Sequence, residues 1–329
     1  MVDLIKRQWF LVGMAVVIAL AFQFPEAGAQ IAEWKILKIA IFIAFFISGL
    51  SLNTEYVKGA ARNIIAVAGA MVSCFVLFPL LAMPLAHLFY NHVISIKAGI
   101  AILAVCPVTL VSGIVLTDIA KGNTALSVMI CIASNVVAIF TIPLSLSLIL
   151  QIGQSVDLPV LQMITNLILV VLLPIMLGLI LQQVLKQMLQ SLHGFFSVFS
   201  QSLVLLIVFN AVSASQTHIL KLGWNLGFLI VWMIGLHILV LVMNFAISRA
   251  IRLDRPATTA FSIQTSQKAL VVAYLIWLDF FSVDLPMALI PPAAYHLIQI
   301  VIDAFIARRI ALHIPSEIKN GTAIVKPGN

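Results

Sequence analysis

Charged residues are scarce in this sequence. Asp, Glu, Lys and Arg make up only 9% of the 329 residues, whereas hydrophobic residues make up 63% and the mean hydropathy is +1.17. A soluble globule needs many more polar side chains to cover its surface, so a soluble protein is excluded. The chain is predicted to be an integral membrane protein in contact with lipid. Its net charge of +7 is expected to lie in loops and not to bind nucleic acid.

Cysteines and catalytic motifs are also scarce. The three cysteines, Cys74, Cys106 and Cys131, fall inside apolar stretches, which disfavours a disulfide framework or a metal cluster and indicates small packing residues. The sequence contains no GxSxG, HExxH or paired-carboxylate motif, and Asp303 is the only well-embedded acid. An intramembrane enzyme is therefore disfavoured, and no cofactor is expected beyond a coupling ion, Na⁺ or H⁺.

Long apolar stretches are what the sequence does have. Stretches of roughly 17 to 25 residues are long enough to cross a bilayer as helices, whereas barrel strands alternate over about ten residues. We therefore predict an all-α membrane protein with ten spans. The expected spans are 8–25, 34–52, 63–88, 94–119, 124–151, 162–185, 198–214, 224–248, 257–278 and 285–311.

The distribution of lysine and arginine predicts the orientation, because cytoplasmic loops carry an excess of both. The loops predicted to be outside hold only Lys35, Lys38, Lys97 and Lys221. The segments predicted to be inside hold Lys6, Arg7, Lys58, Arg62, Lys121, Lys186, Arg249, Arg252, Arg255, Arg308, Arg309, Lys319 and Lys326. Both termini are expected in the cytoplasm. The absence of long glycosylatable loops favours a bacterial inner membrane.

Ten spans divide into two halves of five, which enter the membrane from opposite sides, as in the inverted repeats of many transporters. The predicted repeats are 1–155 and 156–311, separated near Gly153 to Pro159, and residues 312–329 form a polar cytoplasmic tail. An alternative remains at the start of the chain. Lys6 and Arg7 precede an apolar run that ends in Ala27-Gly28-Ala29, a pattern typical of a signal-peptide cleavage site.

The fourth span of each half carries an interruption. In the first half Pro107 removes a backbone donor, and Thr109, Ser112 and Gly113 add polarity and flexibility. The second half has a polar block at mid-membrane depth, consisting of Ser262, Gln264, Thr265, Ser266, Gln267 and Lys268. Interruptions at matching positions of two repeats indicate a binding site, although helices kinked only for packing are the alternative.

The helix after each interruption has a polar face at helical spacing. In the fifth span this face consists of Ser127, Cys131, Ser134 and Asn135, and in the tenth it consists of His296, Gln299 and Asp303. Such residues also serve as hydrogen-bonding contacts between membrane helices, each worth around 0.6 kcal/mol. They are expected either to support the binding site or to hold helices together.

Lys268 is the one basic residue outside the predicted loops. A lysine at the centre of a membrane helix costs about 2.5–3.5 kcal/mol on insertion scales, so something inside the protein must compensate it. One interpretation is a buried ion pair with Asp303. The others are a countercharge for an anionic substrate, a replacement for a coupling cation, or a protonatable group. His237 in the eighth span is either a proton relay or a hydrogen-bonded packing residue.

These features resemble a known family. The ten-span layout, the stretch "CPVTLVSGIVLTDIAKGNTALSV", Ile142-Pro143 and "QTSQKAL" are similar to the bile acid:sodium symporter family, closest to the branch of solute carrier family 10 member 7 and its bacterial relatives. The resemblance implies a core domain of spans 3–5 and 8–10, in which two broken helices cross. A panel domain of spans 1, 2, 6 and 7 would lie beside it, with substrate bound between them.

The resemblance also implies two cation sites. For the first site the matching positions are Ser112 and Gly113, the pair Ser127 and Cys131, and Gln264, which replaces a glutamate shared by both sites. In the second site Lys268 and Cys74 stand where the family has glutamines. Because Na⁺ prefers hard oxygen ligands, the second site is expected to be absent and Lys268 to replace its ion. One Na⁺ is still possible at Ser112, Ser127 and Gln264.

The function expected from the sequence is secondary active symport. An organic, anionic and amphipathic solute would be carried with one Na⁺ or with protons by alternating access. The expected ion- and substrate-binding residues are Ser112, Gly113, Ser127, Cys131, Gln264, Thr265 and Lys268, and the supporting residues are Thr109, Asn135, His296, Gln299 and Asp303. The alternative is a non-transporting membrane regulator or scaffold whose ion site has decayed.

Overall fold

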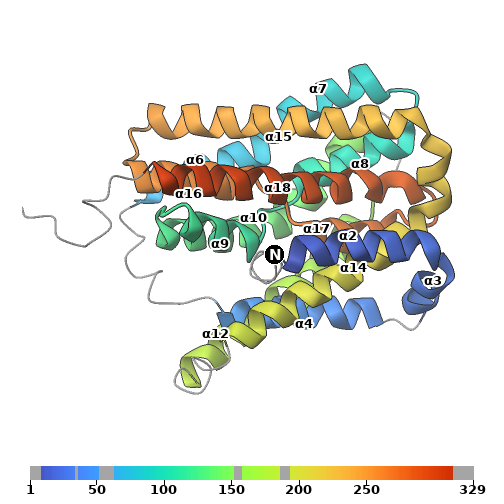
Figure 1. Ribbon diagram of the computed structural model, residues 1–329, viewed down its shortest axis with the longest axis horizontal. Coiled ribbons are helices and arrows are strands. Elements are labelled where there is room, and N and C mark those ends of the chain that lie inside the picture. The colour runs from blue at the N-terminus through green and yellow to red at the C-terminus, as the bar shows by residue number, and fades with distance from the viewer. Residues whose placement is uncertain (1–8, 34–35, 52–62, 152–157, 186–192, 314–329) are drawn as a thin grey trace, which may run out of the picture.

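The computed structural model describes residues 9–33, 36–51, 63–151, 158–185 and 193–313, and within these ranges every regular element is a helix (Figure 1). Several predictions fall outside the described residues. They concern Gly153 to Asp157 of the loop between the halves, the tail beyond His313, and eight basic residues: Lys6, Arg7, Lys35, Lys58, Arg62, Lys186, Lys319 and Lys326.

Six helical stretches are long and apolar enough to cross a membrane, which supports an integral multi-pass protein. They are Ile64–Tyr90, Thr124–Leu150, Val160–Val184, Val198–Leu222, Trp224–Ala250 and Pro286–Leu312. Large apolar side chains on these stretches, such as Leu80, Leu148 and Val231, are exposed as lipid-facing residues would be. These six stretches coincide with six of the ten predicted spans. The inverted repeat of ten spans stays a prediction.

The other predicted spans hold shorter helices. The first two contain α2 (Trp9–Gln23) and α4 (Ile36–Ser51), and between them α3 (Pro25–Glu33) occupies most of a predicted loop. The fourth contains α8 (Ile94–Val105) and α9 (Ser112–Ile119), and the ninth contains α16 (Arg255–Ser266) and α17 (Leu270–Phe280). Both predicted interruptions therefore divide a span into two short helices.

Two of the long stretches contain a single π-helical turn. The third span runs as α6 (Ile64–Val72), the π turn η2 (Ser73–Leu77) and α7 (Phe78–Tyr90). The sixth runs as α11 (Val160–Leu167), the π turn η3 (Ile168–Leu172) and α12 (Leu173–Val184). Each π turn ends two residues before a proline, Pro79 or Pro174. A proline ring clashes with the carbonyl four residues earlier, and the wider turn relieves that clash.

The remaining long helices are continuous: α10 (Thr124–Gln151), α14 (His193–Leu222), α15 (Trp224–Ala250) and α18 (Ile290–Leu312), the last preceded by the short 3-10 helix η4 (Pro286–Leu289). In Figure 1, α15, α16 and α18 lie side by side in one half of the molecule, and α2, α4, α12 and α14 gather in the other. In this view α9, α10 and α17 lie between these groups.

The two breaks meet each other. The first is an extended segment, 106–111, and the second spans Gln267 to Ala269. The Ala269 N–H donates to the Pro107 carbonyl oxygen at 2.9 Å, which joins the breaks by a backbone hydrogen bond. The second break begins later than the polar block indicated. Residues 262–266 are helical, and their polar side chains lie on the last turns of α16.

Basic residues gather at one end of the bundle. Arg249 lies in the last turn of α15, Arg252 in the loop that follows, and Arg255 at the start of α16. Arg255 donates to the His313 carbonyl oxygen just beyond α18. The turn after α9, which holds Lys121, is attached to the start of α16 because the Asn123 N–H donates to the Pro256 carbonyl oxygen. This clustering agrees with the predicted charge asymmetry, but which side faces the cytoplasm stays a prediction.

The contact between α4 and α12 depends on two glycines. A Cβ atom on Gly178 would lie 2.2 Å from the Phe46 carbonyl oxygen, and one on Gly49 would lie 2.3 Å from that of Ile175. We therefore expect Gly178→Ala to force the helices apart and lower the free energy of unfolding by about 1–3 kcal/mol. The measurement is the thermal unfolding midpoint in detergent. Gly227→Ala on α15 is the control, because its Cβ would meet nothing within 4 Å and its midpoint should not fall.

Candidate functional site

The site centres on the ammonium group of Lys268, whose side chain is buried in the second break. Its Nζ atom donates to three backbone carbonyl oxygens, those of Cys74 at 2.9 Å, Ala104 at 3.0 Å and Cys106 at 2.9 Å. The Cys74 Sγ atom lies at 3.2 Å, and the Phe78 ring centroid lies 4.2 Å away. An ammonium group has three donors, so three carbonyls satisfy it fully.

The surroundings explain why a charge is tolerated here. The Ala104 and Cys106 carbonyls are at the end of α8, where the helix dipole is negative and carbonyls lack helical partners. The third carbonyl, that of Cys74, belongs to the π turn η2. Hydrogen bonds to a charged donor are worth about 1.5–3 kcal/mol each, enough to offset the insertion cost. The ion pair with Asp303 considered for Lys268 is wrong, because Asp303 bonds to His237 and Gln267 instead.

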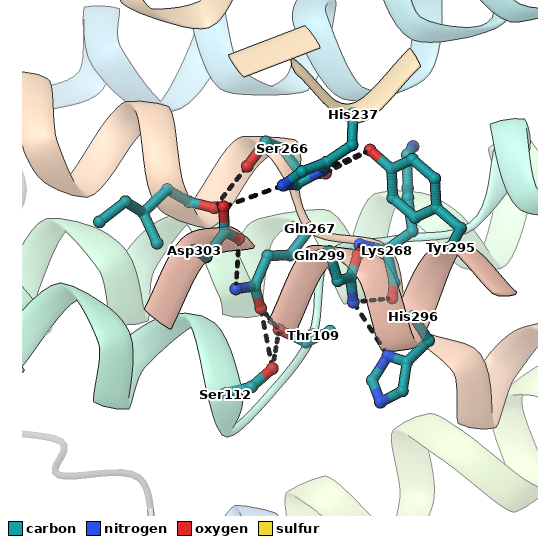
Figure 2. Close-up of polar contacts among 11 residues, drawn as sticks. Thr109, Ser112, His237, Ser266, Gln267, Lys268, Tyr295, His296, Gln299 and Asp303 are labelled. Atoms are coloured by element: carbon teal, nitrogen blue, oxygen red, sulfur yellow. Dashed lines mark hydrogen bonds and ion pairs between the residues drawn. The ribbon is translucent and has the colours of Figure 1, made fainter. Parts of the chain in front are cut away.

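Gln299 of α18 holds the backbone of the second break. Its Oε1 atom accepts from the Lys268 N–H at 2.8 Å, and its Nε2 atom donates to the Lys268 carbonyl oxygen at 2.9 Å. The same Nε2 atom lies 2.9 Å from Nδ1 of His296. Because an amide nitrogen only donates, Nδ1 must accept and Nε2 of His296 carries the ring proton. Figure 2 shows this second ring nitrogen pointing away from Gln299.

Four neutral oxygens converge between α9, α10 and α16. Gln264 Oε1 accepts from the Ser127 hydroxyl at 2.9 Å, and the Thr117 hydroxyl lies 3.2 Å from that of Ser127 and donates to the Gly113 carbonyl oxygen at 2.7 Å. Gln264 Nε2 donates to the Thr109 carbonyl oxygen at 2.8 Å. Neutral oxygen ligands of this kind suit a weakly held monovalent cation.

Gly113 is required by this geometry. A Cβ atom there would lie 2.0 Å from Gln264 Oε1, so any side chain would displace the amide. Ser112, its neighbour, belongs to a different cluster, in which the Ser112 and Thr109 hydroxyls donate to Gln267 Oε1 at 2.8 and 2.6 Å. The structure thus brings Ser127 and Gln264 together, while Ser112 faces the second break.

Three further predicted residues have other surroundings. Asn135 Nδ2 lies 3.4 Å from the Val108 carbonyl oxygen and 2.9 Å from that of Cys131, so it supports the extended segment of the first break. The Cys131 thiol is 4.0 Å from the Leu110 carbonyl oxygen. The Thr265 hydroxyl is buried without a hydrogen-bond partner among the described residues.

A second buried network joins α15 and α18 to the break (Figure 2). His237 Nε2 lies 2.9 Å from Asp303 Oδ1, and His237 Nδ1 lies 3.0 Å from the Tyr295 hydroxyl. The Tyr295 hydroxyl donates to the Ser266 carbonyl oxygen at 2.9 Å. The other carboxylate oxygen, Asp303 Oδ2, accepts from Gln267 Nε2 at 2.8 Å. The Asp303 carboxyl and the His237 ring are both fully buried.

A cavity of about 350 Å³ opens onto the crossing of the two breaks. Its lining is largely apolar, and within the described part of the chain it includes no acidic side chain. The polar lining residues come from both halves of the molecule, and they are Ser48, Thr109, Ser112, Ser200, Gln201, His296 and Arg308. The first residues of α9 and α17, Ser112 and Leu270, both line the cavity. The positive ends of these two helix dipoles therefore lie at the cavity wall.

Sequence reasoning missed three members of these networks: Thr117, Gln267 as a connecting group, and Tyr295. Thr117 lies one turn beyond Gly113, so helical spacing from the first break could have indicated it. Gln267 was part of the polar block, but its bonds to Asp303, Thr109 and Ser112 cross long sequence distances. Nothing in the local pattern distinguishes Tyr295 from a packing aromatic residue.

The chain is similar in sequence to known transport proteins. The sequence profile of the SBF-like CPA transporter family matches residues 8–312. "Probable sodium/metabolite cotransporter BASS4, chloroplastic" from Oryza sativa subsp. indica is 29% identical over 307 residues, covering 88% of this chain and 72% of that protein. "Sodium/bile acid cotransporter 7-A" from Xenopus laevis is 25% identical over 328 residues, covering 94% and 93%. "Uncharacterized sodium-dependent transporter YocS" from Bacillus subtilis is 26% identical over 289 residues, covering 88% and 86%.

Gln299→Leu tests the support of the second break. The substitution leaves the N–H and the carbonyl of Lys268 buried without partners, and each such group costs about 1–3 kcal/mol. We expect a clearly lower thermal unfolding midpoint in detergent. Gln162→Leu on α11 is the control, since Gln162 is exposed and its midpoint should stay unchanged. Equal midpoints for the two variants would contradict a structural role for the Gln299 amide.

Proposed function

Because the chain belongs to the SBF-like CPA transporter family, we propose that it is a secondary active transporter that carries an organic anion across a membrane, driven by a gradient of Na⁺ or H⁺. The family is one of transporters and its relatives are named as cotransporters, so the chain is a transport protein and not an enzyme. The single observation that carries the proposal is the cavity that opens onto two crossing broken helices.

The proposed movement is alternating access. The cavity is lined on one side by α2, α4 and α14, and on the other by both breaks and α18. This arrangement supports a panel of spans 1, 2, 6 and 7 beside a core of spans 3–5 and 8–10, in two inverted repeats of five spans, 1–155 and 156–311. Core and panel would rock against each other around the bound solute. The proposed setting is a bacterial inner membrane with both termini in the cytoplasm.

The proposed solute is anionic and amphipathic. The cavity offers donors and positive dipole ends: His296 Nε2, the guanidinium of Arg308, and the first turns of α9 and α17. Anions bind well at such helix N-termini. The apolar remainder of the lining suits a hydrophobic body attached to the anionic group.

The proposed cation scheme uses one ion. A Na⁺ would be held near Ser127, Thr117 and Gln264 Oε1, close to the Gly113 carbonyl. Lys268 would replace a second ion permanently, because its ammonium already donates hydrogen bonds to three carbonyl oxygens. The same feature favours one competing function, a non-transporting regulator, in which the ion sites have become purely structural.

Sodium binding separates these two functions. We expect the thermal unfolding midpoint to rise in sodium chloride relative to potassium and choline chloride, because an ion at about 100 times its dissociation constant stabilises the fold by roughly 2.7 kcal/mol. Ser127→Ala should reduce the rise. Ser202→Ala, an exposed serine on α14, should keep it. No sodium effect in the wild type, together with no uptake of labelled cholate into reconstituted vesicles under a gradient of either Na⁺ or H⁺, would favour the regulator.

Lys268→Ala tests whether the ammonium stands in for a free cation. The variant leaves three carbonyl oxygens around a small space, and we expect a strongly lowered unfolding midpoint because a buried charged donor is lost. Ammonium chloride should raise that midpoint relative to choline chloride, while the wild type and the exposed-lysine variant Lys221→Ala should not respond. If no small cation restores Lys268→Ala, the carbonyl cluster is not a cation position.

A further inference from the structure

The buried pair of His237 and Asp303 holds one exchangeable proton, and hydrogen-bond counting shows where it is. The Tyr295 hydroxyl has a single proton, which it donates to the Ser266 carbonyl oxygen, so it must accept from His237 Nδ1. Nδ1 therefore carries a proton. Nε2 and Asp303 Oδ1 lie 2.9 Å apart, and two atoms at this distance need a proton between them. With that proton the pair is neutral overall.

Removing this proton rearranges the network. Nε2 and Oδ1 would face each other as two acceptors, which is unfavourable in a buried site. The imidazole must then carry its remaining proton on Nε2, and the Tyr295 hydroxyl must turn to donate to Nδ1. The Ser266 carbonyl, on the last residue of α16, loses its donor. Loss of the proton thus changes the hydrogen bonding at the second break.

A second route connects the pair to the cavity. Asp303 Oδ2 accepts from Gln267 Nε2, and Gln267 Oε1 accepts from the hydroxyls of Thr109 and Ser112, which line the cavity. A negative charge on Asp303 strengthens the first of these bonds and polarises the others. Figure 2 shows these hydrogen bonds running without interruption from the Asp303 carboxyl through Gln267 to Thr109 and Ser112.

We propose that His237 and Asp303 form a proton-binding site, through which the loading of one proton is coupled to the hydrogen bonding of both helix breaks. The inference rests on the proposed transport function and names the site at which a proton would act. Among the described residues, Tyr295 is the titratable group that contacts the pair directly. Lys268 is one step removed, because its ammonium and the Tyr295 ring both pack against Phe78. The three protons of the Lys268 ammonium already have carbonyl oxygens as acceptors.

Asp303→Asn provides a matched test, because asparagine has the shape of the protonated acid. Its amide can donate to His237 Nε2 while its oxygen accepts from Gln267, which imitates the loaded pair without an exchangeable proton. Wild-type protein on a solid-supported membrane should give a transient charge displacement when the pH is stepped within about pH 5 to 9. Asp303→Asn should abolish this signal. His87→Gln, an exposed histidine on α7, should retain it.

The unfolding midpoint gives the second measurement. The described hydrogen bonds are those of the loaded pair, so the wild-type midpoint should fall as rising pH removes the proton, and Asp303→Asn should be insensitive over the same range. If Asp303→Asn does not fold, Tyr295→Phe replaces it. That variant removes the acceptor of Nδ1 and should shift the pH at which the charge signal is half-maximal.

Three results would overturn the inference: no wild-type pH signal, an equal signal in Asp303→Asn, or an unchanged half-maximal pH in Tyr295→Phe. Failure here is distinguishable from failure of the proposed function, because the sodium-specific rise in midpoint depends on Ser127 and Gln264. That rise should persist in Asp303→Asn. Sodium stabilisation without a proton signal would leave the transport proposal standing and refute the proton site.

Discussion

The contact between the Lys268 ammonium and three carbonyl oxygens holds the centre of this protein together. Breaking a helix inside a membrane exposes backbone groups that lipid cannot satisfy. Here the end of α8 and the π turn η2 present free carbonyls, and a lysine from the second break supplies the donors. Gln299 satisfies the backbone of that lysine, and Ala269 bonds to Pro107. Two potential defects therefore stabilise each other.

This arrangement shapes what the site can do. N–H donors from Lys268 and Gln264 bond to the Cys106 and Thr109 carbonyl oxygens of the first break. The cavity beside this crossing is lined by the first turns of α9 and α17, which carry positive dipole ends. Gln267 links the cavity floor to the buried carboxyl of Asp303, so events in the cavity and in the buried pair share one hydrogen-bond chain.

Local sequence properties predicted much of the fold. Hydropathy located the long helices because lipid contact imposes an apolar surface along the whole of each span. Pro107 located the first break because a missing N–H acts on its own turn. The second break was less accurately predicted. Its polar block suggested unwinding, yet residues 262–266 stay helical, since their polar side chains find partners or bury against neighbouring helices without opening the backbone.

The sequence by itself determined that this is a helical membrane protein, that two spans are interrupted, and that Lys268, Gln264 and Asp303 are costly enough to need partners. Only the tertiary structure decided which partners they have. Lys268 bonds to carbonyls more than 160 positions away in the chain, and Asp303 bonds to His237 and not to the lysine. A backbone carbonyl has no residue type, so no sequence pattern marks it as a ligand. Its availability depends on where helices end and how they cross, which packing alone establishes.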